Sequence, residues 1–242
     1  MLRIVNWNVE WRRPRSSAAR TLQARVFGQT PNIICLTESY RDFLPAPGHL
    51  IEAEADYGYP IREGRRKVLL WSEQPWSSVD AVGNPDLPTG RFIRGATDTP
   101  IGPIDVVGVC IPWSGAHVSS GRRDKKRWED HLAYLSTVGR ILPVEPNRLV
   151  VAGDFNQKVP RTIAPVAAYR ALDEAMLSRL RLASMGTIEP AQCQLIDHIA
   201  ISPDLKARSV QSLSNMDGER RLSDHLGVAA TLGLRLPTEL AK

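Results

Sequence analysis

The sequence contains little cysteine and no long apolar run. Its three cysteines, Cys35, Cys110 and Cys193, are odd in number and unevenly spaced, and none belongs to a Cys-x-x-Cys pair or a Cys/His cluster. This pattern argues against a disulfide framework and a zinc site, and it favours buried thiols in a reducing compartment. No stretch approaches the roughly 18 apolar residues of a membrane-spanning helix. Residues 2–5 begin a strand-like segment with no signal peptide before it, so we expect a cytoplasmic protein.

The composition is that of an ordinary globular chain with a basic surface. Its 242 residues, 43% of them hydrophobic, predict a single domain over residues 1–242. Lys and Arg number 31 against 26 Asp and Glu, which gives a formal net charge of +5. The cations gather in four clusters: Arg12, Arg13 and Arg15; Arg62, Arg65, Arg66 and Lys67; Arg122, Arg123, Lys125, Lys126 and Arg127; and Arg220 and Arg221. Such a surface suits a polyanion such as nucleic acid or anionic lipid, with a merely solvated surface as the alternative. Nothing indicates an obligate protein partner.

Short apolar runs alternate with a few amphipathic segments. Residues 3–9 alternate with a period of two, which predicts a strand with Asn6, Asn8 and Glu10 on one side. Further strands are expected at residues 33–36, 68–71, 104–111, 149–152, 195–201 and 226–232. Helices are expected where apolar residues recur at helical spacing: Ala18, Leu22 and Val26; Trp128, Leu132, Leu135, Val138 and Leu142; and Val166, Tyr169, Leu172, Met176 and Leu180. The mixture predicts one sandwich-like α/β domain.

Five polar stretches adjoin the predicted strands: Asn6-Trp7-Asn8-Val9-Glu10, Leu36-Thr37-Glu38-Ser39, Gly153-Asp154-Phe155-Asn156, Ile196-Asp197-His198 and Ser223-Asp224-His225-Leu226-Gly227. In extended chain Asp154 and Asn156 face the same side while Phe155 packs into the core. An Asx-turn after a strand is the alternative explanation of that tetrapeptide. Hard divalent cations bind oxygen ligands, so acids gathered at strand ends suit such an ion. The joint occurrence of all five stretches predicts one metal-assisted hydrolytic site.

The last stretch contains adjacent acidic and imidazole groups. Neighbours in a regular strand point to opposite faces, so Asp224 and His225 reach one site only if they lie in the turn before the strand at 226–232. His225 could then contact a phosphate oxygen or carry a proton, with its second nitrogen held by a carboxylate. Asp197 is the expected partner. Taken alone, the Asp-His pair would equally fit a structural role.

These stretches resemble the signature motifs of the endonuclease/exonuclease/phosphatase superfamily. That group includes DNase I-like nucleases, abasic-site endonucleases, sphingomyelinases and inositol-polyphosphate phosphatases. The resemblance runs from Asn6 to Leu232, and the motifs occur in the family's order. It implies a four-layer α/β sandwich in which two packed mixed β-sheets are flanked by helices. It is highly specific for the superfamily and poorly specific for substrate.

The resemblance also implies a metal-binding set. Glu38 would be the principal ligand, assisted by Glu10, Asn8 and Asp224. The implied ion is Mg²⁺, with Mn²⁺ as an alternative. Such an ion polarises the phosphoryl oxygen and stabilises the leaving oxygen.

The same resemblance implies a catalytic set. Asp154 would orient or deprotonate the attacking water, and Asn156 would position that water or the phosphate. His225, held by Asp197, would stabilise charge on the phosphate. The division of proton transfer between Asp154 and His225 stays open at this point.

One segment departs from the abasic-endonuclease branch that it otherwise resembles. Ile111-Pro112-Trp113, followed by Lys126-Arg127-Trp128, is similar to that branch. However, Cys110 stands where the branch has a tyrosine, and Trp113 where it has an asparagine. A thiol is a poor substitute for the hydrogen bond of a phenol, which argues against specific cleavage at abasic sites. His117, in the following loop, could reach the site, whereas His49, His131 and His198 are assigned to packing or surface.

We therefore expect a metal-dependent nuclease. The basic clusters favour a long polyanion, Trp113 and Trp11 could stack on bases, and Arg122 and Arg123 are expected to bind substrate. The alternative is a phosphatase or phosphodiesterase acting on a phosphoinositide, a sphingolipid headgroup or a small phosphorylated metabolite. A non-catalytic binding module is disfavoured because no acidic position is lost. DNA versus RNA and endo- versus exonuclease action stay open.

Overall fold

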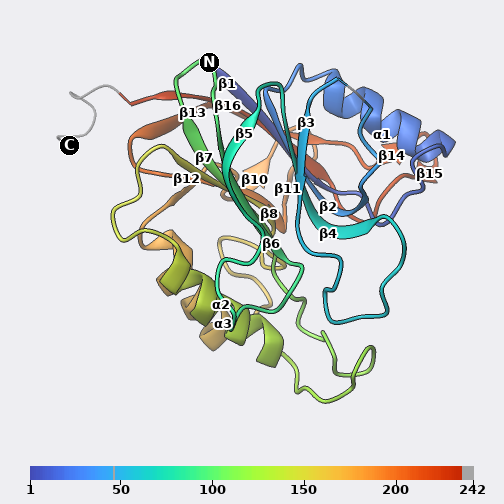
Figure 1. Ribbon diagram of the computed structural model, residues 1–242, viewed down its shortest axis with the longest axis vertical. Helices are drawn as coiled ribbons and strands as arrows, with labels where there is room; N and C mark the ends of the chain where they lie inside the picture. Colours follow the sequence, from blue (N-terminus) through green and yellow to red (C-terminus); the bar gives the residue numbers. More distant parts are fainter. Residues whose placement is uncertain (46, 236–242) are drawn as a thin grey trace.

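The computed structural model describes residues 1–45 and 47–235, in which two six-stranded mixed sheets pack face to face (Figure 1). The strands of the first sheet, in spatial order, are β13 (Leu205–Leu213), β16 (Gly227–Leu234), β1 (Leu2–Asn8), β2 (Ile33–Tyr40), β4 (Arg65–Ser72) and β3 (His49–Glu52). Those of the second are β5 (Trp76–Asp80), β6 (Phe92–Thr97), β7 (Ile104–Cys110), β8 (Leu149–Asp154), β12 (Asp197–Ile201) and β9 (Arg181–Leu182). Two short hairpins lie outside both sheets: β10 (Thr187–Ile188) with β11 (Cys193–Gln194), and β14 (Met216–Asp217) with β15 (Arg220–Arg221).

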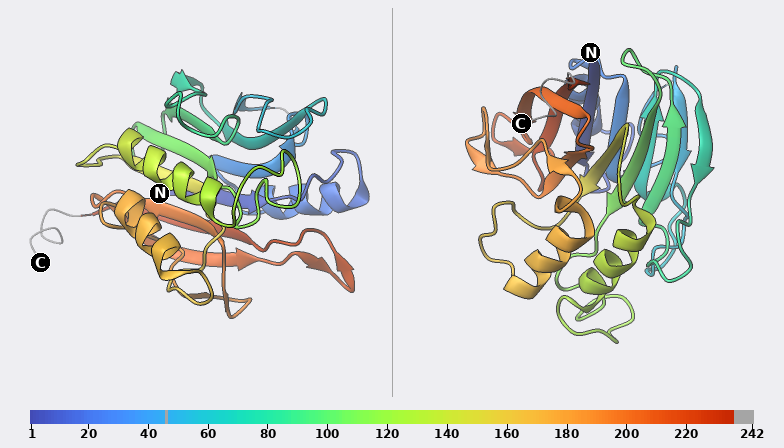
Figure 2. Two further views of the ribbon diagram at one scale, coloured as in Figure 1. Left: turned by 90° about the horizontal axis from the view of Figure 1, so that it is seen from below. Right: turned by 90° about the vertical axis from the view of Figure 1, so that its left-hand side faces the viewer.

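Helices cover the outer faces of both sheets, so the predicted four-layer sandwich is confirmed (Figure 2). Helix α1 (Ser17–Phe27) packs Leu22 and Val26 of the expected stripe on the first sheet, and the third buried residue is Ala19 rather than Ala18, which is only partly buried. Helix α2 (Glu129–Ile141) and helix α3 (Val166–Leu172), which continues into a π-helical turn η1 (Asp173–Leu177), cover the second. None of the helices in the described ranges is long and apolar enough to cross a membrane.

The core between the sheets is mostly apolar. Its buried aliphatic side chains include Ile4, Ile33, Val68, Leu70, Val106, Val150, Ile199, Val228 and Leu232. Each such side chain stabilises the fold by about 1.5–3 kcal/mol relative to an exposed one. Asn6 of β1 is a buried polar residue between the sheets: its Nδ2 donates to the carbonyls of Gly153 (2.9 Å) and His198 (3.2 Å) in the opposite sheet. The packing of the two sheets and the position of β8 and β12 are thereby linked.

Helix α2 and its C-cap bury Leu135, Val138 and Leu142 of the predicted stripe, but Leu132 of that stripe faces outward. Tyr134, Leu135 and Val138 are buried, whereas Leu132 is 36% exposed. The first turn is buried through His131, whose Nδ1 donates to the Pro112 carbonyl at 2.7 Å and whose Nε2 accepts from Gln157 Nε2 at 2.7 Å. Because both ring nitrogens are bonded, a histidine takes an inner position that the apolar pattern assigned to leucine.

The burial of His131 predicts a specific pH dependence of stability. Desolvation lowers the pKa of His131 to about 4, although the bond to the Pro112 carbonyl opposes this. The neutral form therefore stabilises the fold above the unfolded-state pKa of about 6.5, and this contribution is lost as the pH falls toward the folded-state value. Moving from about pH 7 to about pH 5 costs about 2 kcal/mol through this residue.

The variant His131→Gln has no such group to titrate. Urea unfolding should show that the difference in free energy of unfolding between wild type and variant narrows by about 2 kcal/mol over that pH interval. A difference that stays constant would show that His131 is not held neutral.

Candidate active site

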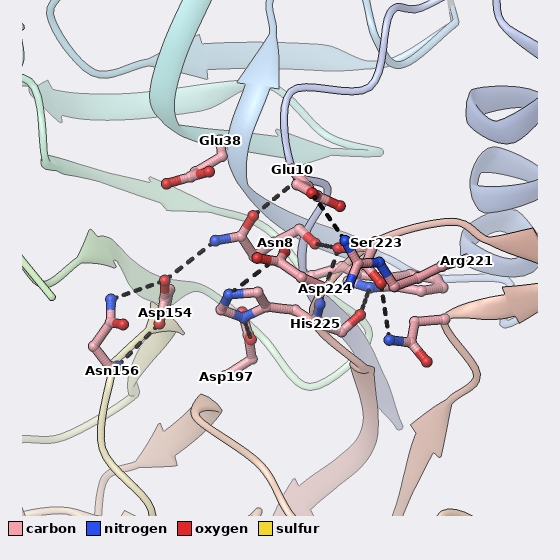
Figure 3. Close-up of polar contacts among 12 residues, drawn as sticks. Asn8, Glu10, Glu38, Asp154, Asn156, Asp197, Arg221, Ser223, Asp224 and His225 are labelled. Atoms are coloured by element: carbon pink, nitrogen blue, oxygen red, sulfur yellow. Dashed lines mark hydrogen bonds and ion pairs between the residues drawn. The ribbon is translucent and has the colours of Figure 1, made fainter. Parts of the chain in front are cut away.

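Four of the five polar stretches line one cleft at the ends of β1, β2 and β8 and at the turn before β16, and Asp197 of the fifth bonds His225 there (Figure 3). The catalytic cleft, as we call it, has a volume of about 270 Å³ and is lined by Asn8, Glu38, Lys67, Arg91, Cys110, Trp113, Asp154, Asn156, Asp224 and His225. The first sheet and its turns supply Asn8, Glu38 and His225, whereas the second supplies Asp154. The cleft thus exists only because the two sheets are packed.

Two buried carboxylates face one another in the second sheet. Strand β8 pairs antiparallel with β12 so that Asp154 lies opposite Asp197, and the two residues are 2% and 1% exposed. Burial and the charge of Asp197 raise the pKa of Asp154 to about 7, although His225 opposes the shift. Burial also raises the pKa of Asp197, against the opposing effect of His225. The arrangement favours a proton acceptor matched to neutral pH at Asp154.

His225 is held as a cation beside these acids. Its Nδ1 is hydrogen-bonded to Oδ2 of Asp197, which leaves Nε2 on the cleft side, 3.8 Å from Oδ1 of Asp224. Burial alone would lower the pKa of His225, but Asp197, Asp154 and Asp224 raise it to about 10. The protonated ring can donate a hydrogen bond from Nε2 to an anion in the cleft.

The turn before β16 brings both neighbours, Asp224 and His225, to the cleft, as the sequence required. Ser223 Oγ donates to the Asn8 carbonyl at 2.7 Å and accepts from the His225 amide at 3.1 Å. The indole of Trp7 donates to the His225 carbonyl at 2.9 Å. The serine at the start of the motif therefore anchors the turn to β1, and Asp224 is left half-exposed with its carboxylate at the cleft mouth.

Asp154 is fixed by three hydrogen bonds. Its Oδ1 accepts from the Asn156 amide (2.9 Å), and its Oδ2 accepts from the side-chain amides of Asn156 (3.0 Å) and Asn8 (3.2 Å). Asn156 Nδ2 also donates to the Ile111 carbonyl at 2.9 Å. Because both donors of that amide are used within the protein, Asn156 offers the cleft its Oδ1 as an acceptor.

The backbone of this motif requires glycine at its start. Gly153 has φ 151°, and a Cβ there would lie 1.8 Å from the Val109 carbonyl oxygen of the neighbouring strand. Phe155 is completely buried, as predicted from the alternation. Asn156 follows with φ 54°, a conformation that asparagine tolerates better than most residues. The local sequence therefore directs both polar side chains into the cleft.

Glu38 projects into the cleft because the backbone of β2 is locally irregular. The residue has φ 50°, and its carbonyl accepts from the Trp11 amide at 2.7 Å. Lys67 Nζ lies 2.5 Å from Oε1, whereas Oε2 makes no bond within the described ranges. A strained conformation at a residue with an uncommitted carboxylate oxygen is typical of a functional position.

The donor set in the cleft fits a hard divalent cation. Glu38 and Asp224 offer carboxylate oxygens, and the amide of Asn8 adds a further oxygen. Asp154, Asp197 and His225 form a second group, whose ligand atoms lie within 4.8 Å of one another. Because Nδ1 of His225 already bonds Asp197, the first set is better suited to a cation and the second to positioning and proton transfer.

Glu10 does not reach the catalytic cleft, contrary to the expected metal-binding set. Its carboxylate pairs with Arg12 at 2.6 Å and lies 3.7 Å from Arg221. The alternation that suggested a shared face stops at Asn8, where β1 ends, because Glu10 and Trp11 both adopt positive φ values of 50° and 55°. The turn directs the Glu10 side chain toward the arginines instead.

The predicted basic contacts also lie outside the catalytic cleft. Arg122 and Arg123 are exposed on the loop before α2, and the Arg122 guanidinium pairs with Asp124 at 3.1 Å. His117 of the same loop is only 3% exposed and stacks on Tyr59 with ring centroids 4.4 Å apart. Trp113, by contrast, borders the cleft and is 47% exposed.

Sequence reasoning missed two cations in the cleft, Lys67 and Arg91. Lys67 belongs to a basic cluster whose other members cannot be distinguished from it by spacing. Arg91 stands apart from every cluster, directly before β6. No local signal marks either residue, because both reach the cleft through the packing of β4 and β6 beside β2 and β7.

Solved structures with the same architecture have low sequence identity to this chain. An endonuclease/exonuclease/phosphatase from Beutenbergia cavernae has a TM-score of 0.69 at 18% identity, over 96% of this chain and 71% of that chain. NExo, a 3′ phosphatase from Neisseria solved with a product DNA hairpin, has a TM-score of 0.68 at 18% identity, over 96% and 99%. The human Nocturnin catalytic domain, solved with bound sulfate, has a TM-score of 0.65 at 16% identity, over 97% and 93%. These likenesses show the fold. A search among curated proteins finds no match.

The sequence itself supplies the link to a family. The model of the Endonuclease/Exonuclease/phosphatase family matches residues 5–225, a span that contains all five polar stretches up to His225. Proteins of this superfamily are metal-dependent enzymes that hydrolyse phosphate esters. The chain therefore belongs to the endonuclease/exonuclease/phosphatase family.

Proposed function

We propose that this protein is a Mg²⁺-dependent phosphodiester hydrolase that cleaves DNA or RNA, and that residues 1–242 form one catalytic domain. The observation that carries the proposal is the composition of the cleft. A carboxylate fixed by two amides, Asp154, and an imidazole fixed by a buried acid, His225, border the same hollow as Glu38 and Asp224. These groups can activate a water molecule and stabilise the charge on a phosphate in the same site.

Each residue of the cleft has a separate role in the proposed reaction. Asp154 accepts the proton of the attacking water, and Asn156 accepts a hydrogen bond from the same water through Oδ1. His225, fixed by Asp197, donates from Nε2 to a non-bridging phosphate oxygen. Mg²⁺ held by Glu38 and Asp224 with Asn8, or Mn²⁺ in its place, would supply Lewis-acid polarisation of the phosphoryl group.

Several observations support a nucleic-acid substrate. The chain has a net charge of +5, and the exposed ring of Trp113 borders the cleft. The Neisseria relative was solved with DNA, and a second Neisseria structure is described as a 3′-5′ exonuclease. A cytoplasmic location is part of the proposal and agrees with the free thiols of Cys35, Cys110 and Cys193.

A second candidate follows from the size of the catalytic cleft. A volume of about 270 Å³ would also accept a single phosphorylated headgroup or metabolite. A phosphatase or phosphodiesterase acting on a phosphoinositide, a sphingolipid headgroup or a small phosphorylated metabolite is therefore the alternative.

A substrate panel separates these candidates. With Mg²⁺ the protein should cleave at least one of plasmid, single-stranded DNA, RNA and an abasic-site duplex while leaving a phosphoinositide intact, and EDTA should abolish the activity. Asp154→Asn should lower kcat by about 10³-fold because the proton acceptor is lost. Asp173→Asn, an exposed acid on η1, is the matched control and should behave as wild type.

Two results would contradict the proposal. Cleavage that survives EDTA or the Asp154→Asn substitution would contradict the mechanism. Turnover confined to the phosphoinositide would contradict the nucleic-acid substrate.

The salt dependence of the reaction gives an independent prediction. If about three phosphates are neutralised on binding, kcat/KM on an oligonucleotide duplex should fall roughly 40-fold between about 50 and about 200 mM salt, through counterion release. A small chromogenic phosphodiester serves as the control and should lose little activity over that range. A flat response on the oligonucleotide would rule out a long polyanion as the natural substrate.

A further inference from the structure

Arg91 is a buried cation without an acidic partner. The residue is 3% exposed, and its Nη1 reaches only the Cys110 carbonyl (3.3 Å) and Sγ (3.9 Å). Across residues 1–45 and 47–235 its Nε and Nη2 make no hydrogen bond, and it forms no ion pair. Arginine is rarely buried without a partner, since the desolvated charge must be compensated. An anion supplied from outside would provide that compensation.

Arg91 stands between the catalytic cleft and a second hollow of about 300 Å³. The two hollows share Glu38, Lys67, Arg91 and Trp113 and are therefore adjacent. Their charges differ. The cationic hollow, as we call the second, is bordered by four cations, Arg62, Arg65, Lys67 and Arg91, and by a single acid, Glu38.

The catalytic cleft is nearly balanced in charge. Its acids, Glu38, Asp154 and Asp224, surround the position suited to a metal ion, and its cations are Lys67, Arg91 and His225. A scissile phosphate bound there by a cation lies beside the cationic hollow. The next negative charge along a substrate would therefore enter a site lined by guanidinium and ammonium groups.

Three aromatic rings that line the cationic hollow, Trp11, Tyr57 and Tyr59, form a column. Arg65 lies 4.7 Å from the ring centroid of Trp11, Trp11 stacks on Tyr57 at 5.6 Å, and Tyr57 is followed by Tyr59 at 6.1 Å. Tyr59 stacks in turn on His117. Because these ring faces are occupied within the protein, the column holds the wall in place and is not itself a surface for base stacking.

Trp113 is the aromatic ring that remains open. One face lies against Gly115, where a Cβ would come within 2.4 Å of the indole. Trp113 is 47% exposed and borders both hollows. Its other face is therefore accessible between the scissile phosphate in the catalytic cleft and the flanking phosphate in the cationic hollow. A nucleobase linking two consecutive phosphates would fit this position.

We propose that Arg91, with Lys67, binds the phosphate adjacent to the scissile one on a nucleic-acid strand whose intervening base stacks on Trp113. This inference rests on the proposed function and specifies its substrate: a strand with at least two consecutive phosphates rather than an isolated phosphate ester. Arg91 is a specificity residue that recognises the flanking charge, while Asp154 and His225 act at the scissile phosphate.

The test compares a thymidine trinucleotide with its two isomers that carry one neutral methylphosphonate linkage each. For wild type, kcat/KM should be at least about tenfold higher on the all-phosphate strand than on the isomer that neutralises the flanking position. Arg91→Gln should reduce this ratio to about two or less, and Arg91→Lys should give an intermediate value. Arg140→Gln, on the exposed face of α2 and paired with Asp86 and Thr137, should keep the wild-type ratio.

Binding provides a readout that does not need turnover. The dissociation constant of a fluorescein-labelled thymidine trinucleotide in EDTA, followed by anisotropy, should weaken about tenfold in Arg91→Gln. Cleavage by wild type with no preference for the flanking charge, or an equal loss on all three strands in both Arg91 variants, would overturn this site. No cleavage by wild type, with Arg91-dependent binding intact, would overturn the proposed function and support the site.

Discussion

The candidate active site depends on the antiparallel pairing of β8 with β12, which sets Asp154 opposite Asp197 in the core. Burial raises the pKa of both carboxyls, so each is easier to protonate than in water, and the charge of Asp197 adds to this effect at Asp154. His225 makes the arrangement tolerable, because its imidazolium bonds Asp197 and offsets the charge of Asp154. The register of two strands thus fixes a proton acceptor and a cation side by side.

The first sheet keeps that pair in position. Asn6 bonds carbonyls of both β8 and β12, and two residues later Asn8 bonds the Asp154 carboxylate. Ser223 and Trp7 fix the turn that carries His225 to the same strand, β1. Strand β1 therefore positions both Asp154 of the second sheet and His225 of the turn before β16. Such a site is preorganised by the packing of the fold, as catalysis by fixed charges requires.

Much of the fold and the central residues of the site could be predicted, because the polar motifs directly follow or precede apolar runs of period two. The positions of residues that depend on tertiary packing or on irregular backbone could not be predicted from the sequence. Glu10 left the expected face because left-handed backbone ends the alternation after Asn8. The edge strand Leu205–Leu213 has few buried residues and shows no apolar run. In the first turn of α2, His131 occupies the buried position at which Leu132 was expected. Arg91 reaches the cleft only through the pairing of β6 with β7.

The central claim is that Asp197 acts on the reaction through His225 and not independently. A double-mutant cycle of Asp197→Asn and His225→Gln, with kcat measured on the preferred oligonucleotide, tests it most directly. Each single variant should lower kcat by about 10²-fold. The kcat of the double variant should be no lower than that of the less active single variant. Losses that multiply to about 10⁴-fold would show that the two residues act separately and would contradict the account.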